Sequence, residues 1–123
     1  MLKIHAKKSG EVTILCLQGR IVAGEATALR DAVLSRSDTS ILVLDLARVT
    51  GIDAGGLGLM LELREQTQAK GIKFRLRNVT KLVQQVFEIT RLNSVFEIYS
   101  EGEVLSEASR AQPATVLELA PCV

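Results

Sequence analysis

The positions of apolar and polar residues predict a chain that alternates between strands and helices. Five short segments predict strands, at residues 3–8, 11–18, 41–46, 73–77 and 95–98. The runs at 11–18 and 41–46 are almost continuously apolar, which is typical of strands covered on both faces. The run at 73–77 alternates strictly between polar and apolar residues, so it predicts a strand with one solvated face. Ser9-Gly10 predicts a hairpin turn between the first two strands.

Four other segments have the apolar spacing of helices, and they begin near Glu25, Asp53, Thr80 and Glu103. The second is apolar nearly all round in its first half and polar in its second half, so we expect it to enter the core by its N-terminus. Gly71 follows it, where a helix-terminating glycine is expected. In the third, Thr80 is the expected N-cap, and the expected buried stripe is Leu82, Val83, Val86 and Ile89.

The order of these elements, β-β-α-β-α-β-α-β-α, predicts a single α/β domain over residues 1–110 and a tail over residues 111–123. We expect a mixed, mostly parallel sheet of four to five strands packed with about four helices. Residues 19–24 and 47–52 are expected to be connections. In such sheets, binding sites lie where strands give way to helix N-termini, which here indicates the loop at residues 49–56.

The composition argues against several classes of binding partner. The chain has 123 residues and an aromatic share of 3%, which argues against stacking platforms for single-stranded nucleic acid or sugars. The net charge of +1 provides no strong field for nucleic acid, so no such partner is expected. Residues 64–91 carry seven basic and two acidic side chains, whereas residues 92–123 carry five acidic and one basic. This asymmetry suits self-association or partner steering, and two ordinary solvated faces would also produce it.

The expected compartment is the cytoplasm. The N-terminal residues lack the apolar stretch of a signal peptide, and no run approaches the ~18 apolar residues of a membrane span. Direct membrane insertion is therefore not expected. The two cysteines, Cys16 and Cys122, have no metal-binding or CxxC spacing. Cys16 lies in an apolar run, and we expect it to be a buried, reduced thiol.

Enzyme chemistry has little support in the sequence. The single histidine, His5, lies in a strand with polar neighbours and has no oriented partner. No hydrolase elbow, zinc-protease motif or metal-spaced cluster occurs. Residues 55–58, Gly-Gly-Leu-Gly, lack the Lys and Ser/Thr that complete a phosphate-binding loop. We therefore expect a protein that is not an enzyme and that has no catalytic residues, no metal site and no cofactor.

The start of the second helix is the remaining candidate site. Asp53 precedes two glycines and can cap the helix by accepting backbone N–H bonds. Free N–H groups at Gly55 and Gly56 would make a concavity that suits an anion. Alternatively, the glycines only permit a tight turn and close packing of the helix on the sheet. Both interpretations stay open from the residues alone.

Residues 41–58, ILVLDLARVTGIDAGGLG, resemble the core signature of the STAS domain, the family of anti-sigma factor antagonists. The usual pattern is an apolar strand ending in Asp-Leu, followed by Val-Thr/Ser-x-Ile-Asp-Ser-Ser-Gly-Leu-Gly at the start of a helix. The resemblance extends to residues 17–21, Leu-Gln-Gly-Arg-Ile, and to the segments at 73–83, 89–92 and 95–98. It covers about residues 3–108 and implies a single STAS-like domain.

The resemblance implies a protein that binds an anti-sigma factor, which is also a serine kinase, in a bacterial partner-switching system that regulates transcription. The kinase phosphorylates the first Ser of the family's Asp-Ser-Ser-Gly motif. Here Asp53 and Gly56 match the motif, but Ala54 and Gly55 replace the two serines. The position of the phosphoacceptor is thus held by Ala54, and the nearest hydroxyl, Thr50, is not the usual acceptor. Val22 stands where antagonists often carry an Asp.

The resemblance places partner binding on two segments, the loop at residues 20–24 and the start of the second helix. The implied residues are Arg20, Val22, Gly24, Asp53, Ala54, Gly55, Gly56, Leu57 and Met60, of which the last two would present or support an apolar contact. Three alternatives remain. The protein is an antagonist that always binds, a STAS subunit of an ABC-type membrane transport complex, or a nucleotide- or anion-binding STAS module. A homodimer is also compatible with the sequence.

Overall fold

A computed structural model of the chain describes residues 2–35 and 38–99. Its strands are β1 (Lys3–Ser9), β2 (Val12–Ile21), β3 (Ile41–Ile52), β4 (Lys73–Arg77) and β5 (Ile98–Tyr99). Its helices are the short 3-10 helix η1 (Ala23–Glu25) and the α-helices α1 (Ala26–Leu34), α2 (Ala54–Ala69) and α3 (Lys81–Ile89). The predicted α/β architecture is therefore present. The predicted fourth α-helix and the tail at 111–123 lie outside the described residues.

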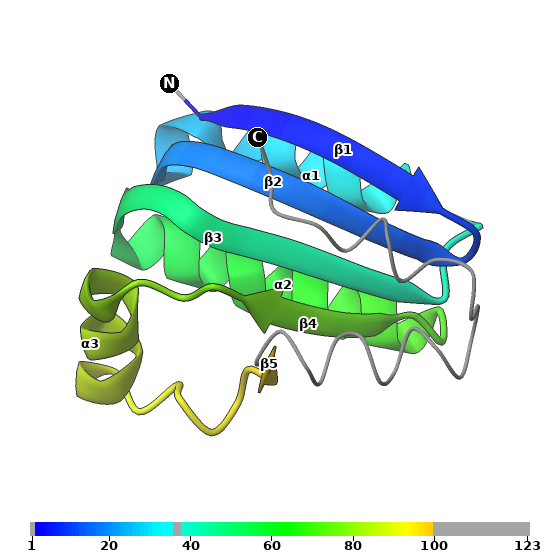
Figure 1. Cartoon of the computed structure of the whole chain (residues 1–123). Helices are drawn as coiled ribbons and strands as arrows, with labels where there is room; N and C mark the ends of the chain where they lie inside the picture. The colour runs from blue at the N-terminus through cyan, green and yellow to red at the C-terminus, as the bar shows by residue number, and fades with distance from the viewer. Residues whose placement is uncertain (1, 36–37, 100–123) are drawn as a thin grey trace.

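The five strands form one mixed sheet in the order β1-β2-β3-β4-β5. β1 and β2 form the predicted antiparallel hairpin, and Gly10 in its turn has a φ of 59° that favours glycine. The pairs β2–β3, β3–β4 and β4–β5 are all parallel. The parallel strands β2, β3 and β4 therefore finish at the same end of the sheet, where α2 and α3 begin (Figure 1).

The core lies between one face of the sheet and the helices. α1 and α2 both lie behind the sheet in the view of Figure 1, and α3 lies beside the end of β4. The core cluster combines sheet residues such as Leu15, Leu44 and Phe74 with Met60 and Leu63 of α2. All five are buried. The N-terminal half of α2 enters the core, as its apolar pattern predicts.

The ends of β2 and β3 differ from the expectation. Residues 19–21 continue β2, and residues 47–52 continue β3, so neither segment is only a connection. The register between the two strands shifts twice, between Cys16 and Gln18 and between Gly19 and Arg20. These irregularities let the strands stay paired through a polar stretch that lacks the apolar pattern of the strand body. β5 is also shifted along the chain, to Ile98–Tyr99 instead of 95–98.

Two predicted burial patterns are only partly right. In α3, Val83 is buried and Val86 is partly buried as expected, whereas Leu82 is 49% and Ile89 is 82% exposed and Phe87 is buried. The helix is rotated so that Phe87, which was missing from the expected stripe, packs against the ring of Phe96 with centroids 5.1 Å apart. In β4, Arg77 is buried instead of solvated because it forms an ion pair with Asp45 of β3.

Cys16 is buried as expected, but it is disulfide-bonded in the structure, so the prediction of a reduced thiol is wrong. Cys122, the other cysteine of the sequence, lies outside the described residues. None of the described helices is long and apolar enough to cross a membrane.

Candidate functional site

The candidate site forms where β2 and β3 end together. Arg20 of β2 is the register partner of Gly51, and Ile21 is the register partner of Ile52. η1 follows β2 and α2 follows β3, so the two segments implied in partner binding lie next to each other. The amide of Asp53 donates a hydrogen bond of 3.3 Å to the carbonyl of Ile21, which ties the two chain segments together.

Asp53 is the N-cap of α2. Its backbone is extended, with φ −107° and ψ 179°, and its side-chain Oδ1 accepts a hydrogen bond of 2.7 Å from the Gly56 amide. The Leu57 amide bonds to the Asp53 carbonyl at 2.9 Å, which closes the first turn. The predicted cap is confirmed, and its carboxylate lies at the positive end of the helix, where a negative charge is stabilised.

The two glycines of the site are explained by close packing. A Cβ atom on Gly56 would lie 2.0 Å from the carbonyl oxygen of Ile21, and one on Gly55 would lie 2.5 Å from the Cβ of Ala23. Any side chain at either position would therefore collide with the end of β2 or with η1. This favours the packing interpretation over an anion site, because the Gly56 amide is already used by Asp53 and a carboxylate occupies the helix end.

Six of the nine implied partner-binding residues lie at or near the surface. Arg20, Gly24, Asp53, Ala54 and Gly55 are exposed, and Val22 is partly exposed. Arg20 extends beside Gly51, since a Cβ on that glycine would lie 3.4 Å from Arg20 Nε. The exposed surface thus combines a cation from β2 with the capped start of α2. Ala54 is the first residue of that helix, and its methyl side chain has no hydroxyl that could be phosphorylated.

Gly56, Leu57 and Met60 cannot touch a partner in this structure because they are buried. Met60 is fully buried and Leu57 is 8% exposed, and both belong to the core cluster. Of the two expected roles for Leu57 and Met60, only the support of the surface from beneath fits this burial.

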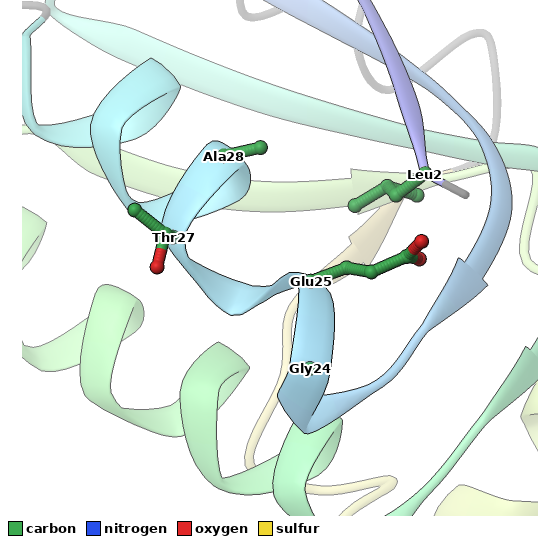
Figure 2. Close-up of a pocket in the computed structure, with 5 residues that line it drawn as sticks. All are labelled: Leu2, Gly24, Glu25, Thr27 and Ala28. Atoms are coloured by element: carbon green, nitrogen blue, oxygen red, sulfur yellow. The ribbon is translucent and has the colours of Figure 1, made fainter.

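A shallow pocket borders the site on the side of η1 and α1. It has a volume of about 220 Å³ and is lined by Leu2, Gly24, Glu25, Thr27 and Ala28. Figure 2 shows the Glu25 side chain extending toward Leu2, the residue that precedes β1. Pockets that enclose small molecules usually exceed this volume. A second pocket, of about 390 Å³, is lined by residues of α1 and α2 at the far end of α2 and contains no residue of the 49–56 loop.

One buried polar cluster was missed by the reasoning from sequence. Asp45 Oδ2 accepts hydrogen bonds from Arg77 Nε at 2.6 Å and from Asn78 Nδ2 at 2.9 Å, and its Oδ1 accepts one from the Ala47 amide at 3.0 Å. An Asp inside the apolar run 41–46 was the available signal. The bonds from Arg77 and Asn78 to the Asp45 carboxylate anchor the end of β4 to β3. Within residues 2–35 and 38–99, no group of three or more His, Cys, Asp or Glu could hold a metal ion.

A family model described as the STAS domain matches residues 3–103. The chain belongs to the STAS domain family. Among curated relatives, this STAS domain is 28% identical over 109 residues to BtrV of Bordetella bronchiseptica, described as a candidate anti-sigma factor antagonist. That similarity covers 87% of this chain and 94% of BtrV. The resemblance inferred from residues 41–58 is thereby confirmed.

Solved structures share the fold of this STAS domain. The anti-sigma factor antagonist SpoIIAA in its unphosphorylated form matches with a TM-score of 0.71 and 17% identity, over 90% of this chain and 97% of that one. A sulfate transporter family protein from Wolinella succinogenes matches with a TM-score of 0.67 and 20% identity, over 91% and 92%. A structure of Mglu is 36% identical with a TM-score of 0.55, over 58% of this STAS domain, which spans only 18% of the Mglu chain.

Proposed function

We propose that this STAS domain is an anti-sigma factor antagonist that binds an anti-sigma factor of the serine-kinase type and is not switched by phosphorylation at residue 54. The observation that carries the proposal is the exposed start of α2, where the family's Asp and Gly are present and Ala54 replaces the acceptor serine. The similarity to BtrV over 94% of that protein supports the same role.

The geometry supports a rigid binding surface at the start of α2. Asp53 and the close contact of Gly56 with Ile21 hold the start of α2 rigidly against the end of β2. A rigid surface loses little conformational freedom when a partner binds. The proposed contact residues are Arg20, Val22, Gly24, Asp53, Ala54 and Gly55. The protein has no proposed catalytic role, and its proposed compartment is the cytoplasm, where such partners act.

The proposed loss of regulation has a simple electrostatic basis. A phosphate on the first residue of α2 would add about −1.5 to −2 charges beside the Asp53 carboxylate, in the middle of the contact surface. Repulsion and desolvation would then oppose binding of a partner that fits the neutral form. Ala54 resembles an unphosphorylated serine in size and charge, so the surface stays in its binding form.

The test compares the wild-type chain with Ala54→Ser and Ala54→Glu, each incubated with candidate anti-sigma factor kinases with and without ATP. We expect the wild type to bind one candidate in both conditions. Ala54→Ser should bind without ATP and lose binding when ATP allows its phosphorylation. Ala54→Glu should bind at least ten-fold more weakly, which corresponds to about 1.4 kcal/mol.

Thr50→Ala is the matched control, because Thr50 is exposed on β3 and carries the nearest hydroxyl. It should bind as the wild type does. A stoichiometric phosphate on Thr50 of the wild type would contradict the proposal that phosphorylation does not regulate this antagonist. Lack of binding to any kinase-type anti-sigma factor would overturn the partner class.

A transport subunit is the second candidate, favoured by one observation: a domain that assembles with a transporter needs no acceptor serine, and none stands at residue 54. The similarity to the Wolinella sulfate transporter family protein concerns the fold. Co-purification with a transporter ATPase in place of an anti-sigma factor would support this alternative. A homodimer would appear in the same experiments as a doubled mass of the free protein.

A further inference from the structure

The face of the sheet opposite α1 and α2 is apolar at its centre. Strand alternation places Ile14 and Cys16 of β2 and Ile41 and Val43 of β3 on this face. All four are buried, and Val43 is 0% exposed. None of the four belongs to the core cluster that the sheet forms with the helices.

The described helices do not account for this burial. α1 and α2 both lie on the other side of the sheet (Figure 1). An apolar strand face is stable only when another layer covers it. The cover of this face must therefore come from a part of the chain outside residues 2–35 and 38–99, or from another molecule.

Basic residues border the apolar centre on both sides. The same alternation places Lys3 and Lys7 of β1 on this face, and Lys73 and Arg75 of β4 on its other border, where Arg75 also forms an ion pair of 3.2 Å with Glu97. Asp45 at the centre is neutralised by Arg77. A complementary cover would thus be apolar in the middle and acidic overall.

We propose that residues 100–123 of this chain dock across this face as its cover. That segment carries four acidic residues against one basic, Arg110. It also contains apolar residues in two groups, Val104-Leu105 and Val116-Leu117 with Leu119. Its composition therefore matches an apolar surface with a basic border. The proposal is independent of the proposed function, because it concerns the face of the sheet and not the start of α2.

The reach of the segment fits the topology. It follows β5, the last strand of the order β1-β2-β3-β4-β5, so it must pass β4 and β3 to reach β2. Strands lie ~4.8 Å apart, so three spacings amount to about 14 Å. Even if residues 99–122 were wholly helical, at ~1.5 Å per residue they would span about 35 Å. The chain is long enough in any conformation.

Cys16 points to the same segment. It lies on this face and is disulfide-bonded in the structure, and the only other cysteine of the sequence is Cys122. Docking of residues 100–123 would place these two sulfurs together. With oxidised glutathione as the oxidant, the two thiols lose two electrons and two protons to form the disulfide, and two molecules of reduced glutathione are released. Under reducing conditions, the apolar contacts and ion pairs would hold the segment without the bond.

The first test uses the full chain with Cys16→Ala and a maleimide nitroxide on Cys122. We expect the methyl signals of Ile14 and Val43 to lose most of their NMR intensity, while Leu63 on the helix side keeps most of its intensity. Reduction of the nitroxide with ascorbate is the diamagnetic control. Equal loss at all three residues, or no loss at Ile14 and Val43, would overturn the proposal.

The second test exposes the reduced wild-type chain to oxidised glutathione and maps disulfides by peptide mass. We expect a monomer with a 16–122 bond. Leu117→Asp with Leu119→Asp should slow its formation at least ten-fold, whereas the control Gln112→Asp with Ala114→Asp, which adds the same charge, should slow it less than two-fold. A bond between two chains would assign the face to a second copy, and failure to form any bond would reject the docked segment.

Discussion

Asp45 and Arg77, 32 residues apart, form an ion pair in which each side chain is only 3% exposed, with 2.6 Å between Oδ2 and Nε. Both charges would be costly to bury alone, so the pair is stable only because each partner is present. Asn78 and the Ala47 amide satisfy further acceptor sites of the carboxylate. The cluster links the end of β4 to the middle of β3.

We expect Asp45→Ala to lower the free energy of unfolding by about 3–5 kcal/mol, because it leaves the Arg77 guanidinium buried without its counter-charge. Urea denaturation followed by circular dichroism measures this. Glu62→Ala is the matched control: Glu62 pairs with Arg30 at 2.7 Å, but the two side chains are 42% and 40% exposed. Its loss should cost less than about 1 kcal/mol. Equal effects of the two substitutions would contradict the importance of the buried pair.

The two glycines at 56 and 58 should respond in opposite directions to alanine. A Cβ at Gly56 would lie 2.0 Å from the Ile21 carbonyl oxygen, so Gly56→Ala must push α2 away from β2. We expect a loss of at least about 1–3 kcal/mol. Gly58 lies in the same helix with no atom within 4 Å of the added Cβ. Gly58→Ala should therefore raise stability by up to about 1 kcal/mol through helix propensity. Thermal unfolding of both variants measures these changes relative to the wild type. A Gly56→Ala variant as stable as the wild type would contradict the close contact between α2 and β2.

Much of this architecture was predictable because local patterns carry it. The apolar run 41–46, the Asp53 cap and Gly71 with its φ of 78° each depend on neighbouring residues alone. The polar continuation of β3 to Ile52 was not predictable, because its pairing depends on register shifts against β2. The burial of Arg77 was also not predictable, because its partner Asp45 is 32 residues away in the sequence. At the candidate site, the sequence indicated the right loop, but the burial of Gly56, Leu57 and Met60 follows from packing between elements.

The corrected orientation of α3 leads to a paired prediction. Phe87 is fully buried beside Phe96, whereas Ile89 is 82% exposed. We expect Phe87→Ala to cost about 3–5 kcal/mol through the cavity it leaves. Ile89→Ala should change stability by less than about 0.5 kcal/mol, as surface substitutions usually do. Urea titrations of the two variants measure both changes in stability. A large loss of stability in Ile89→Ala would contradict the exposed position of Ile89 and favour the buried stripe expected from the apolar spacing.

The proposed partner surface can be tested separately from stability through Arg20. This side chain is exposed beside Gly51 at the end of β2, so its replacement should leave the fold intact. We expect Arg20→Glu to lower the association rate with the anti-sigma factor at least ten-fold at low salt, because charge at an interface mainly steers encounter. Lys70→Glu is the control, since Lys70 is exposed and caps the opposite end of α2, about 24 Å away by helix rise. Both variants change the net charge equally, so stopped-flow association measured at two salt concentrations separates a local contact from a general charge effect. Equal slowing by both variants would place the partner contact elsewhere than at the ends of β2 and β3.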